Sequence, residues 1–301
     1  MIENSVLTLV ADHTAGTALR NLSETARRVL ANAGAAVDGP DWLKDDHAVD
    51  LPFGGLALDA AKAAIEAAAL PAGVDYCVQE AEGRRKKLFL ADMDSTMITI
   101  ECIDELADFA GLKAEVSAIT EQAMQGKLEF TDAFRARVKM LTGLREEVLQ
   151  QVYDERVVMT AGARTLVQTL RANGCYTALV SGGFTFFTSR VREALGFHMD
   201  MSNELLFENG TLTGAAKEPI LNSAAKLATL ERLIVEKNIP RRETLAIGDG
   251  ANDIPMIEAA GLGVAFHAKE KAAKAADANI RYGDLTTLLY FQGYRESDFV
   301  G

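Results

Sequence analysis

The sequence is poor in cysteine, proline and tryptophan and has no long uninterrupted apolar run. Its cysteines, Cys77, Cys102 and Cys175, are scattered without C-x-x-C spacing, which favours packing as small apolar side chains over disulfides or a metal site. With only 6 prolines among 301 residues, the chain is typical of a globular protein. No apolar stretch reaches the length of a membrane span, and residues 1–4 lack a basic signal-peptide start, so we expect a cytoplasmic protein.

Basic side chains are also in the minority. The chain has 31 Lys and Arg against 43 Asp and Glu, which gives a net charge of −12. This balance argues against nucleic acid as a partner and favours solubility. With 49% hydrophobic and 25% charged residues, the chain has enough apolar material for a packed core and room for two domains. We therefore expect a small-molecule partner rather than nucleic acid or a membrane.

Three short apolar runs each lead into a polar turn. The runs 87–91, 177–180 and 244–247 are followed by D-M-D-S-T at 92–96, S-G-G at 181–183 and G-D-G-A-N-D at 248–253. Such runs are typical of buried parallel strands. Any one of the turns alone could be an ordinary loop. Because ligands of open α/β sheets bind outside the carboxyl ends of the strands, we expect the three turns to meet at one site.

Helical patterns alternate with these strands and predict a doubly wound parallel sheet of the α/β class. The expected helices cover 163–173, 184–195 and 222–237, short further strands cover 263–265 and 278–280, and Asn209-Gly210 predicts a hairpin over 205–213. Between the first and second strands, apolar residues recur at three and four from Glu101 to about Leu149. We expect a helical cap inserted at about 99–160.

The first part of the chain, 1–80, has the pattern of a separate small α+β domain. Expected strands at 5–11 and 74–78, expected helices at 17–33 and 58–70, and one or two irregular strands between the helices give a β-α-β(β)-α-β order. That order predicts a ferredoxin-like sandwich, as in ACT-like amino-acid-sensing modules. A regulatory role and a packing or homodimer-forming role both stay open. The charged segment at 80–85 would link it to a second domain at 85–301.

The ordered combination of D-x-D-S-T, a strand ending in Ser-Gly, a lysine and G-D-G-x-N-D resembles the haloacid dehalogenase superfamily of phosphohydrolases. Within it, the chain looks like the phosphoserine phosphatases, over roughly residues 85 to 295. This resemblance implies a HAD-like Rossmannoid core and a Mg²⁺-dependent phosphoric monoester hydrolase. It further implies hydrolysis of O-phospho-L-serine to L-serine and phosphate through a phosphoaspartyl intermediate, the last step of L-serine biosynthesis.

The two aspartates of the first turn fit the chemistry of phosphoryl transfer. Asp92 would be the nucleophile, and Asp94, two residues on, the proton donor and general base. Mg²⁺ prefers oxygen ligands, and Asp92, the backbone carbonyl of Asp94 and Asp249 make the expected site. The cation would neutralise charge that otherwise repels a phosphate from the nucleophile.

The phosphate of the substrate also needs hydrogen-bond donors. Ser181 and the backbone amide of Gly182 are the expected donors after the middle strand. By sequence alone Lys226 reads as a surface lysine, but the resemblance implies that it binds phosphate, with Lys217 as the alternative. The resemblance also places Asn252 near the phosphate and Asp253 behind the metal and the lysine.

Substrate choice is expected to come from the cap. An acid for an ammonium group and an arginine for a carboxylate are what a zwitterionic amino acid needs, and Glu101 and Arg137 are the candidates. Arg135 competes with Arg137 for this role, and a solvated helix face is an equally open interpretation of each charge. The resemblance implies that Met124 and Phe130 line the same pocket. The alternatives are another small phosphomonoester, transfer of the phosphoryl group to a second alcohol, or a serine-sensing protein that only binds.

Overall fold

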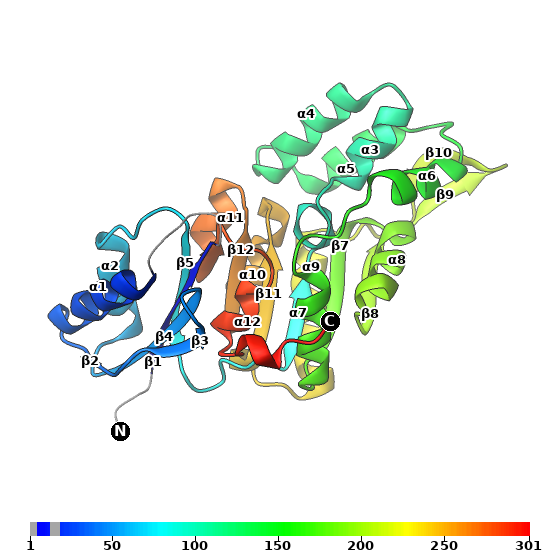
Figure 1. Ribbon diagram of the computed structural model, residues 1–301. Helices are drawn as coiled ribbons and strands as arrows, with labels where there is room; N and C mark the ends of the chain where they lie inside the picture. The colour runs from blue at the N-terminus through cyan, green and yellow to red at the C-terminus, as the bar shows by residue number, and fades with distance from the viewer. Residues whose placement is uncertain (1–4, 13–18) are drawn as a thin grey trace.

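One twisted sheet runs through the molecule and carries most of its helices (Figure 1). The computed structural model describes residues 5–12 and 19–301. The strands of this sheet are β1 (Ser5–Ala11), β2 (Ala36–Val37), β3 (Asp41–Lys44), β4 (Ala48–Gly54), β5 (Val74–Glu80), β6 (Leu88–Ala91), β7 (Tyr176–Phe184), β8 (Met199–Asn203), β11 (Thr244–Gly248), β12 (Leu262–Phe266) and β13 (Ala278–Ile280). Their order is β2-β4-β1-β5-β13-β12-β11-β6-β7-β8, and β3 pairs with β4. The strands from β13 to β8 pair in parallel.

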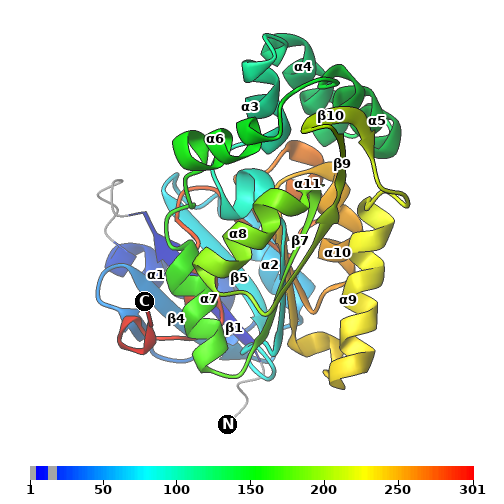
Figure 2. The same cartoon turned by 90° about the vertical axis from the view of Figure 1, so that its right-hand side faces the viewer.

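Helices cover both faces of the parallel part (Figure 2). One face carries α9 (Ser223–Lys237) and α10 (Ile254–Ala259), and the other carries α7 (Ala163–Ala172) and α8 (Thr185–Leu195). Strand β6 packs against helices on both faces. Leu90 lies in the apolar cluster with α9 and α10, and Phe89 lies in the cluster with α7 and α8. Successive side chains of a strand point to opposite faces, which explains the unbroken apolar run of the sequence. The predicted doubly wound α/β architecture is confirmed.

The N-terminal part extends the other end of the sheet. Its chain order is β1, α1 (Leu19–Asn32), β2, β3, β4, α2 (Leu58–Ala67) and β5, which follows the expected succession with one additional short strand. Both helices pack on an apolar cluster of their own that includes Leu7, Leu30 and Ile65. The expected helix start at Thr17 lies outside the described residues. Strand β5 pairs with β13 antiparallel at Tyr76, so the sheet continues without a break into the parallel part.

A group of helices stands over the carboxyl end of β6, where the sequence predicts the cap (Figure 1). These helices are α3 (Cys102–Phe109), α4 (Lys113–Met124), α5 (Phe130–Met140) and α6 (Glu147–Arg156). The segments by which the chain enters and leaves this insertion lie side by side and are joined by hydrogen bonds. The amide of Thr99 donates to the carbonyl of Val158 at 3.0 Å, and the amide of Thr160 donates to that of Met97 at 3.0 Å.

The predicted hairpin is present as a separate two-stranded sheet, β9 (Leu205–Glu208) and β10 (Thr211–Ala216). Both turn residues, Asn209 and Gly210, have positive φ, at 51° and 75°, as a type I′ turn requires. The hairpin packs beside α5, and the amide of Gly143 donates to the carbonyl of Leu212 at 2.8 Å. This contact with the cap was not predicted, because it joins elements far apart in the chain.

The middle strand is longer than predicted. We expected it to end at Val180, but β7 continues through the S-G-G segment to Phe184. Its pairing with β8 resumes after a register shift at Phe184 and Asn203, and the Asn203 side chain donates to the carbonyl of Gly182 at 2.9 Å. This support keeps the two glycines extended where a turn was expected.

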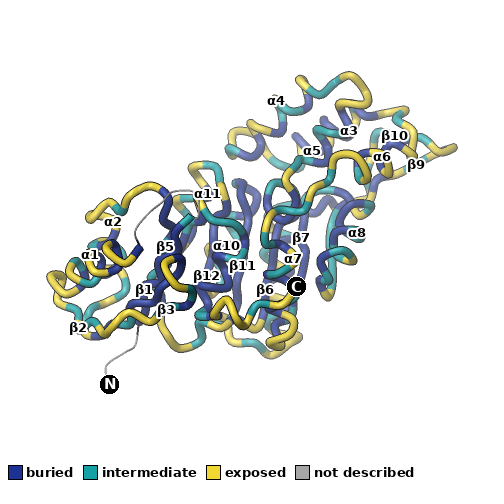
Figure 3. The backbone as a smooth tube through the Cα atoms, viewed as in Figure 1, coloured by how far each residue is buried: buried dark blue, intermediate teal, exposed yellow. Residues whose placement is uncertain are grey.

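Burial follows the central strands, whereas the outer helices of the cap are largely exposed (Figure 3). Near the C-terminus, α11 (Glu270–Ala275) lies at the surface and α12 (Thr287–Phe291) is buried, with Tyr290 only 1% exposed. In the described part of the chain, no helix combines the length and the apolar character that crossing a bilayer needs.

Candidate active site

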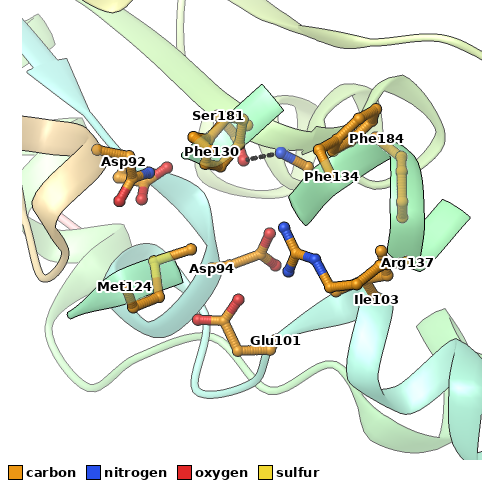
Figure 4. Close-up of a pocket in the computed structure, with 13 residues that line it drawn as sticks. Asp92, Asp94, Glu101, Ile103, Met124, Phe130, Phe134, Arg137, Ser181 and Phe184 are labelled. Atoms are coloured by element: carbon orange, nitrogen blue, oxygen red, sulfur yellow. Dashed lines mark hydrogen bonds between the residues drawn. The ribbon is translucent and has the colours of Figure 1, made fainter. Parts of the chain in front are cut away.

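The three polar segments of the sequence meet under the cap in one cavity of about 30 Å³ (Figure 4). Strands β6, β7 and β11 lie next to each other in the sheet, so the chain that follows each of them reaches the same edge. The residues that line the cavity are Asp92, Asp94, Glu101, Ile103, Met124, Phe130, Phe134, Arg137, Ser181, Gly182, Gly183, Phe184 and Asn252.

Asp92 directly follows β6 and is 4% exposed. Its Oδ1 accepts a hydrogen bond from the amide of Met93 at 2.8 Å and lies 2.7 Å from Nζ of Lys226. Burial, and then the nearby carboxylate of Asp253, raise the pKa of Asp92 to about 7. A bound cation would oppose this shift, because positive charge favours the ionised carboxylate.

Lys226 is a buried lysine, not the surface lysine that its helical pattern alone suggests. It lies in α9, is 1% exposed, and bonds Asp253 Oδ1 at 2.6 Å as well as Asp92. Burial works against its charged form, but the carboxylates of Asp253 and Asp92 outweigh it and raise the pKa of Lys226. The ammonium group is therefore permanently charged inside the site.

Asp253 connects this lysine to the last strand. Its Oδ2 accepts from the amide of Gly250 at 3.2 Å, and its carboxyl group packs against Gly248. A Cβ on Gly248 would lie 2.3 Å from Cγ of Asp253, so the close packing requires glycine at that position. The resemblance implies a place for Asp253 behind the metal and the lysine, and its carboxylate does contact Lys226.

Three buried carboxylates can hold a metal ion. Asp92, Asp249 and Asp253 each offer an oxygen within 4.8 Å of the others. Burial, and then the negative charges of Glu101, Asp253 and Asp92, raise the pKa of Asp249, because each of them disfavours a further negative charge in the cluster. An all-oxygen donor set of this kind suits a hard divalent cation. The cluster includes the predicted ligands Asp92 and Asp249.

Asp94 lies on the cavity wall beside Asp92. Its Oδ1 accepts from the amide of Cys102 at 3.2 Å, at the start of α3. A Cβ on Gly183 would lie 2.6 Å from Asp94 Oδ2, so this glycine leaves the carboxyl group its room. Burial, opposed in part by the bond from Cys102, raises the pKa of Asp94 to about 7. Such a carboxyl group can hold and release a proton near neutral pH.

Further polar groups line the cavity at the end of β7 and after β11. Ser181 is 1% exposed, and its Oγ accepts from the amide of Gly183 at 2.9 Å. Gly182 lies against the Phe130 ring, where a Cβ would come within 2.5 Å of Cζ. The buried Oδ1 of Asn252 has no hydrogen-bond partner among the described residues. The predicted residues Ser181, Gly182, Asn252 and Phe130 therefore share one cavity.

The cap segment contributes one acidic and one basic side chain, Glu101 and Arg137, to the same cavity (Figure 4). Glu101 precedes α3, and its Oε1 accepts from the hydroxyl of Ser95 at 2.6 Å. Burial, and then the charge of Asp94, raise the pKa of Glu101 to about 8. Arg137, on α5, is 2% exposed, and its guanidinium lies toward Asp94 and Glu101. The predicted Met124 lines the cavity as well.

The structure separates the candidates that the sequence left open. Arg135 is exposed on α5 and bonds Glu218 at 2.9 Å, whereas Arg137 lines the cavity. Lys217 is exposed and bonds Glu204 at 2.9 Å, whereas Lys226 bonds Asp92. Geometry thus favours Arg137 as the carboxylate-binding arginine and Lys226 as the phosphate-binding lysine.

Several lining residues were not predicted, namely Ile103, Phe134, Gly183 and Phe184. Phe134 carried a usable signal, because it shares a helix face with Phe130 and Arg137 at spacings of four and three. Gly183 belongs to the S-G-G segment itself. The sequence pattern gives no such signal for Ile103.

Comparison with known proteins agrees with this geometry. Residues 89–258 match the family model of haloacid dehalogenase-like hydrolases. A phosphoserine phosphatase of Archaeoglobus fulgidus is 44% identical over 72% of this chain and 63% of its own length. One of Albidiferax ferrireducens is 45% identical over 67% of this chain and 88% of its own length. The crystal structure of a HAD family hydrolase from Salmonella enterica serovar Typhi matches with a TM-score of 0.82, at 29% identity over 95% of this chain and 97% of that chain.

The match leaves part of some relatives uncovered, since the chain spans less than two thirds of the length of the Archaeoglobus protein. The family model nevertheless covers more than half of this chain, and it contains the strands β7 and β11 and all of β6 but its first residue. It also contains the aspartates after β6 and β11 and the buried lysine of α9. The chain belongs to the haloacid dehalogenase-like hydrolase family.

Proposed function

We propose that this protein is a Mg²⁺-dependent phosphoserine phosphatase, which hydrolyses O-phospho-L-serine to L-serine and inorganic phosphate. The observation that carries the proposal is the presence of Glu101 and Arg137 in the same cavity as Asp92 and Asp94. The first pair suits an ammonium and a carboxylate, and the second suits phosphoryl transfer. The names of the relatives support the same substrate. With L-serine as its product, the reaction would complete L-serine biosynthesis.

Asp92 would attack the phosphorus atom and form an aspartyl phosphate while the bond from phosphorus to the serine oxygen breaks. Asp94, whose pKa of about 7 lets it carry a proton at neutral pH, would donate that proton to the serine oxygen. In the second half, Asp94 takes a proton from water, whose oxygen attacks the phosphorus and releases phosphate. Asp92 is thereby regenerated.

Several buried groups would stabilise the negative charge of the transferred phosphoryl group. Lys226 supplies a fixed positive charge next to Asp92, and Ser181 and Asn252 add polar atoms on the cavity wall. Mg²⁺, held by Asp92 and Asp249 with the backbone carbonyl of Asp94, would supply charge neutralisation at the phosphate. Asp253 would keep Lys226 in place through their 2.6 Å bond.

The charge of Glu101 would respond to the substrate. In the cavity as it stands, a pKa of about 8 keeps Glu101 largely protonated at neutral pH. The ammonium group of phosphoserine would favour the ionised form and pair with it. Arg137 would bind the substrate's carboxylate.

The N-terminal segment 1–80 is proposed as a regulatory or packing domain beside a phosphatase domain at 85–301, with the cap at about 99–160. Its separate apolar cluster around Leu7 and Ile65 supports this division. Homodimer formation and a cytoplasmic location remain predictions of the sequence.

Phosphate release from O-phospho-L-serine, measured with Mg²⁺ and with EDTA beside p-nitrophenyl phosphate, tests the proposal. Metal-dependent turnover with a strong preference for phosphoserine is the expected result. Activity on the generic ester alone would keep the phosphatase chemistry and reject the assignment of Glu101 and Arg137. Activity on neither compound would favour a protein that only binds.

A further inference from the structure

The guanidinium of Arg137 is held from outside the cavity by a neighbouring helix. Its Nη1 donates to the hydroxyl oxygen of Thr120, on α4, at 2.9 Å, and its Nε donates to the carbonyl of Ala133, on its own helix, at 3.2 Å. Thr120 is 3% exposed and does not line the cavity. These two bonds use two of the five N–H groups of the guanidinium, so the remaining donors can serve a ligand.

The Thr120 hydroxyl is in turn oriented by a carboxylate. Its oxygen lies 2.6 Å from Oδ1 of Asp104, on α3, and 3.1 Å from the carbonyl of Val116. The shorter contact to the charged acceptor takes the hydroxyl proton, which leaves the oxygen lone pairs facing Arg137. Ser117 fixes the second oxygen of Asp104 through a 2.7 Å hydrogen bond. Three cap helices therefore contribute to one chain of hydrogen bonds that ends on Arg137.

Such a chain affects binding because an arginine side chain has many rotamers. An unsupported guanidinium would lose that freedom only when the substrate arrives, and the loss would weaken binding. Arg137 also lies toward Asp94 and Glu101, whose carboxyl oxygens can accept its N–H groups in place of the carboxylate of the substrate. Thr120 and Asp104 hold it in one orientation before the substrate enters.

We propose that Thr120 and Asp104 are positioning residues that fix Arg137 for the carboxylate of the substrate and so set selectivity for carboxylate-bearing phosphomonoesters. The inference rests on the proposed function, because it concerns the same cavity. It names two residues that touch neither the phosphate nor the reacting atoms. Their effect should therefore be on recognition of the carboxylate and not on the phosphoryl-transfer step.

The test compares O-phospho-L-serine with O-phosphoethanolamine, which lacks the carboxylate, as substrates of the full chain with Mg²⁺. Thr120→Val keeps the side-chain volume and removes the hydroxyl. We expect it to raise KM for phosphoserine roughly tenfold and to leave kcat nearly unchanged. Kinetic constants for phosphoethanolamine should stay close to those of the unmodified protein. Thr120→Ser, which restores a hydroxyl, should recover most of the selectivity, and Asp104→Asn should lose part of it.

A matched control distinguishes the orientation of Arg137 by Thr120 from a general weakening of the contact between α3 and α4. Lys113→Ala removes the 2.7 Å ion pair with Glu105, which joins the same two helices, α3 and α4, without contacting Thr120 or Arg137. This variant should keep the selectivity between the two substrates. Equal losses on both substrates for Thr120→Val, or the same loss of selectivity for Lys113→Ala, would overturn the inference.

A double-mutant cycle gives the second criterion. If Thr120 acts through Arg137, then Thr120→Val should have no further effect on KM for phosphoserine in an Arg137→Ala background. An additional rise in KM there would contradict the inference while leaving the proposed function intact. Failure of the unmodified protein to hydrolyse phosphoserine is a different result, which would remove the proposed function and this inference together.

Discussion

Nζ of Lys226 lies 2.7 Å from Oδ1 of Asp92, and both side chains are almost fully buried. A buried cation in contact with a carboxylate lowers the electrostatic cost of bringing a phosphate to that carboxylate. The pair also depends on Asp253, which bonds the same ammonium group at 2.6 Å. The positive charge from α9 and the negative charges that follow β6 and β11 therefore balance one another, although these elements lie far apart in the sequence.

Replacing Lys226 with methionine should lower kcat/KM roughly a hundredfold, because the fixed positive charge beside the phosphate is lost. It should also lower the free energy of unfolding of the metal-free protein by about 3 kcal/mol, since two buried carboxylates lose their partner. Steady-state kinetics and urea denaturation measure the two effects. Lys217→Met, at an exposed lysine paired with Glu204, is the control and should change neither. Normal activity of the Lys226 variant would refute the phosphate-binding role.

Asp92→Asn should reduce turnover by roughly a thousandfold or more, because an amide cannot form the acyl phosphate. The substitution keeps the shape of the side chain, so phosphoserine should still bind. Phosphate release and isothermal titration calorimetry check the two statements. Asp59→Asn, at an exposed position of α2, serves as the control. Multiple turnover at the normal rate by the Asp92 variant would exclude Asp92 as the nucleophile.

Arg137→Ala should raise KM for phosphoserine at least about tenfold and change KM for phosphoethanolamine far less, because only the first substrate has a carboxylate. Arg135→Ala is the natural comparison, since that arginine lies two residues away on the same helix and bonds Glu218 outside the cavity. It should behave like the unmodified protein. If Arg135→Ala gives the larger effect on phosphoserine, the assignment of the two arginines is reversed.

The metal-free protein should lose stability as the pH rises. In the folded protein the pKa values of Asp92 and Asp94 are raised to about 7 and that of Glu101 to about 8. The unfolded chain has already released these protons above about pH 5, so it binds fewer protons than the folded chain. The free energy of unfolding should therefore fall between about pH 5 and pH 8, by at least about 2 kcal/mol.

Urea denaturation across this pH range, with EDTA and with Mg²⁺, measures the effect. Mg²⁺ should reduce the loss, because a cation stabilises the ionised carboxylates. Glu101→Gln removes one titrating group and should make the metal-free profile shallower. Identical pH profiles with and without Mg²⁺ would contradict a metal site among these carboxylates.

Deletion of residues 1–80 should leave phosphatase activity but lower thermal stability, because all the predicted catalytic residues lie beyond that segment. The segment is tied to the rest of the molecule by Asp75, which accepts from the amides of Arg281 and Gly283 at 2.8 Å, and by Gln79, which donates to the carbonyl of Phe291 at 2.6 Å. Thermal unfolding and phosphate release check the expectation. A truncated protein that is folded but wholly inactive would show that the two parts do not function independently.

Much of the site was predictable because its elements are local. An apolar run followed at once by D-M-D-S-T or G-D-G-A-N-D indicates a strand and the polar segment at its carboxyl end, and parallel pairing then brings Asp92 and Asp249 together. The Asn209-Gly210 turn was likewise local, since its backbone conformation depends on the two residues themselves.

Other features depended on packing. Residues two apart on a helix point in different directions, so only one of Arg135 and Arg137 can face the cavity. The packing of α5 on the cap decides which one does. Lys226 is buried only because the strands beside α9 bring two carboxylates to its ammonium group. The part played by Thr120 needs three helices in contact, which no local pattern encodes.

By itself the sequence determined the strands, the polar segments that follow them and the chemistry that those segments can perform, because each depends on neighbouring residues and on the regular geometry of a parallel sheet. The tertiary structure decided which charged side chains are buried and which stay in water. A helical charge on its own is most stable in solvent, and only partners brought from other elements, as for Lys226 and Arg137, make its burial favourable.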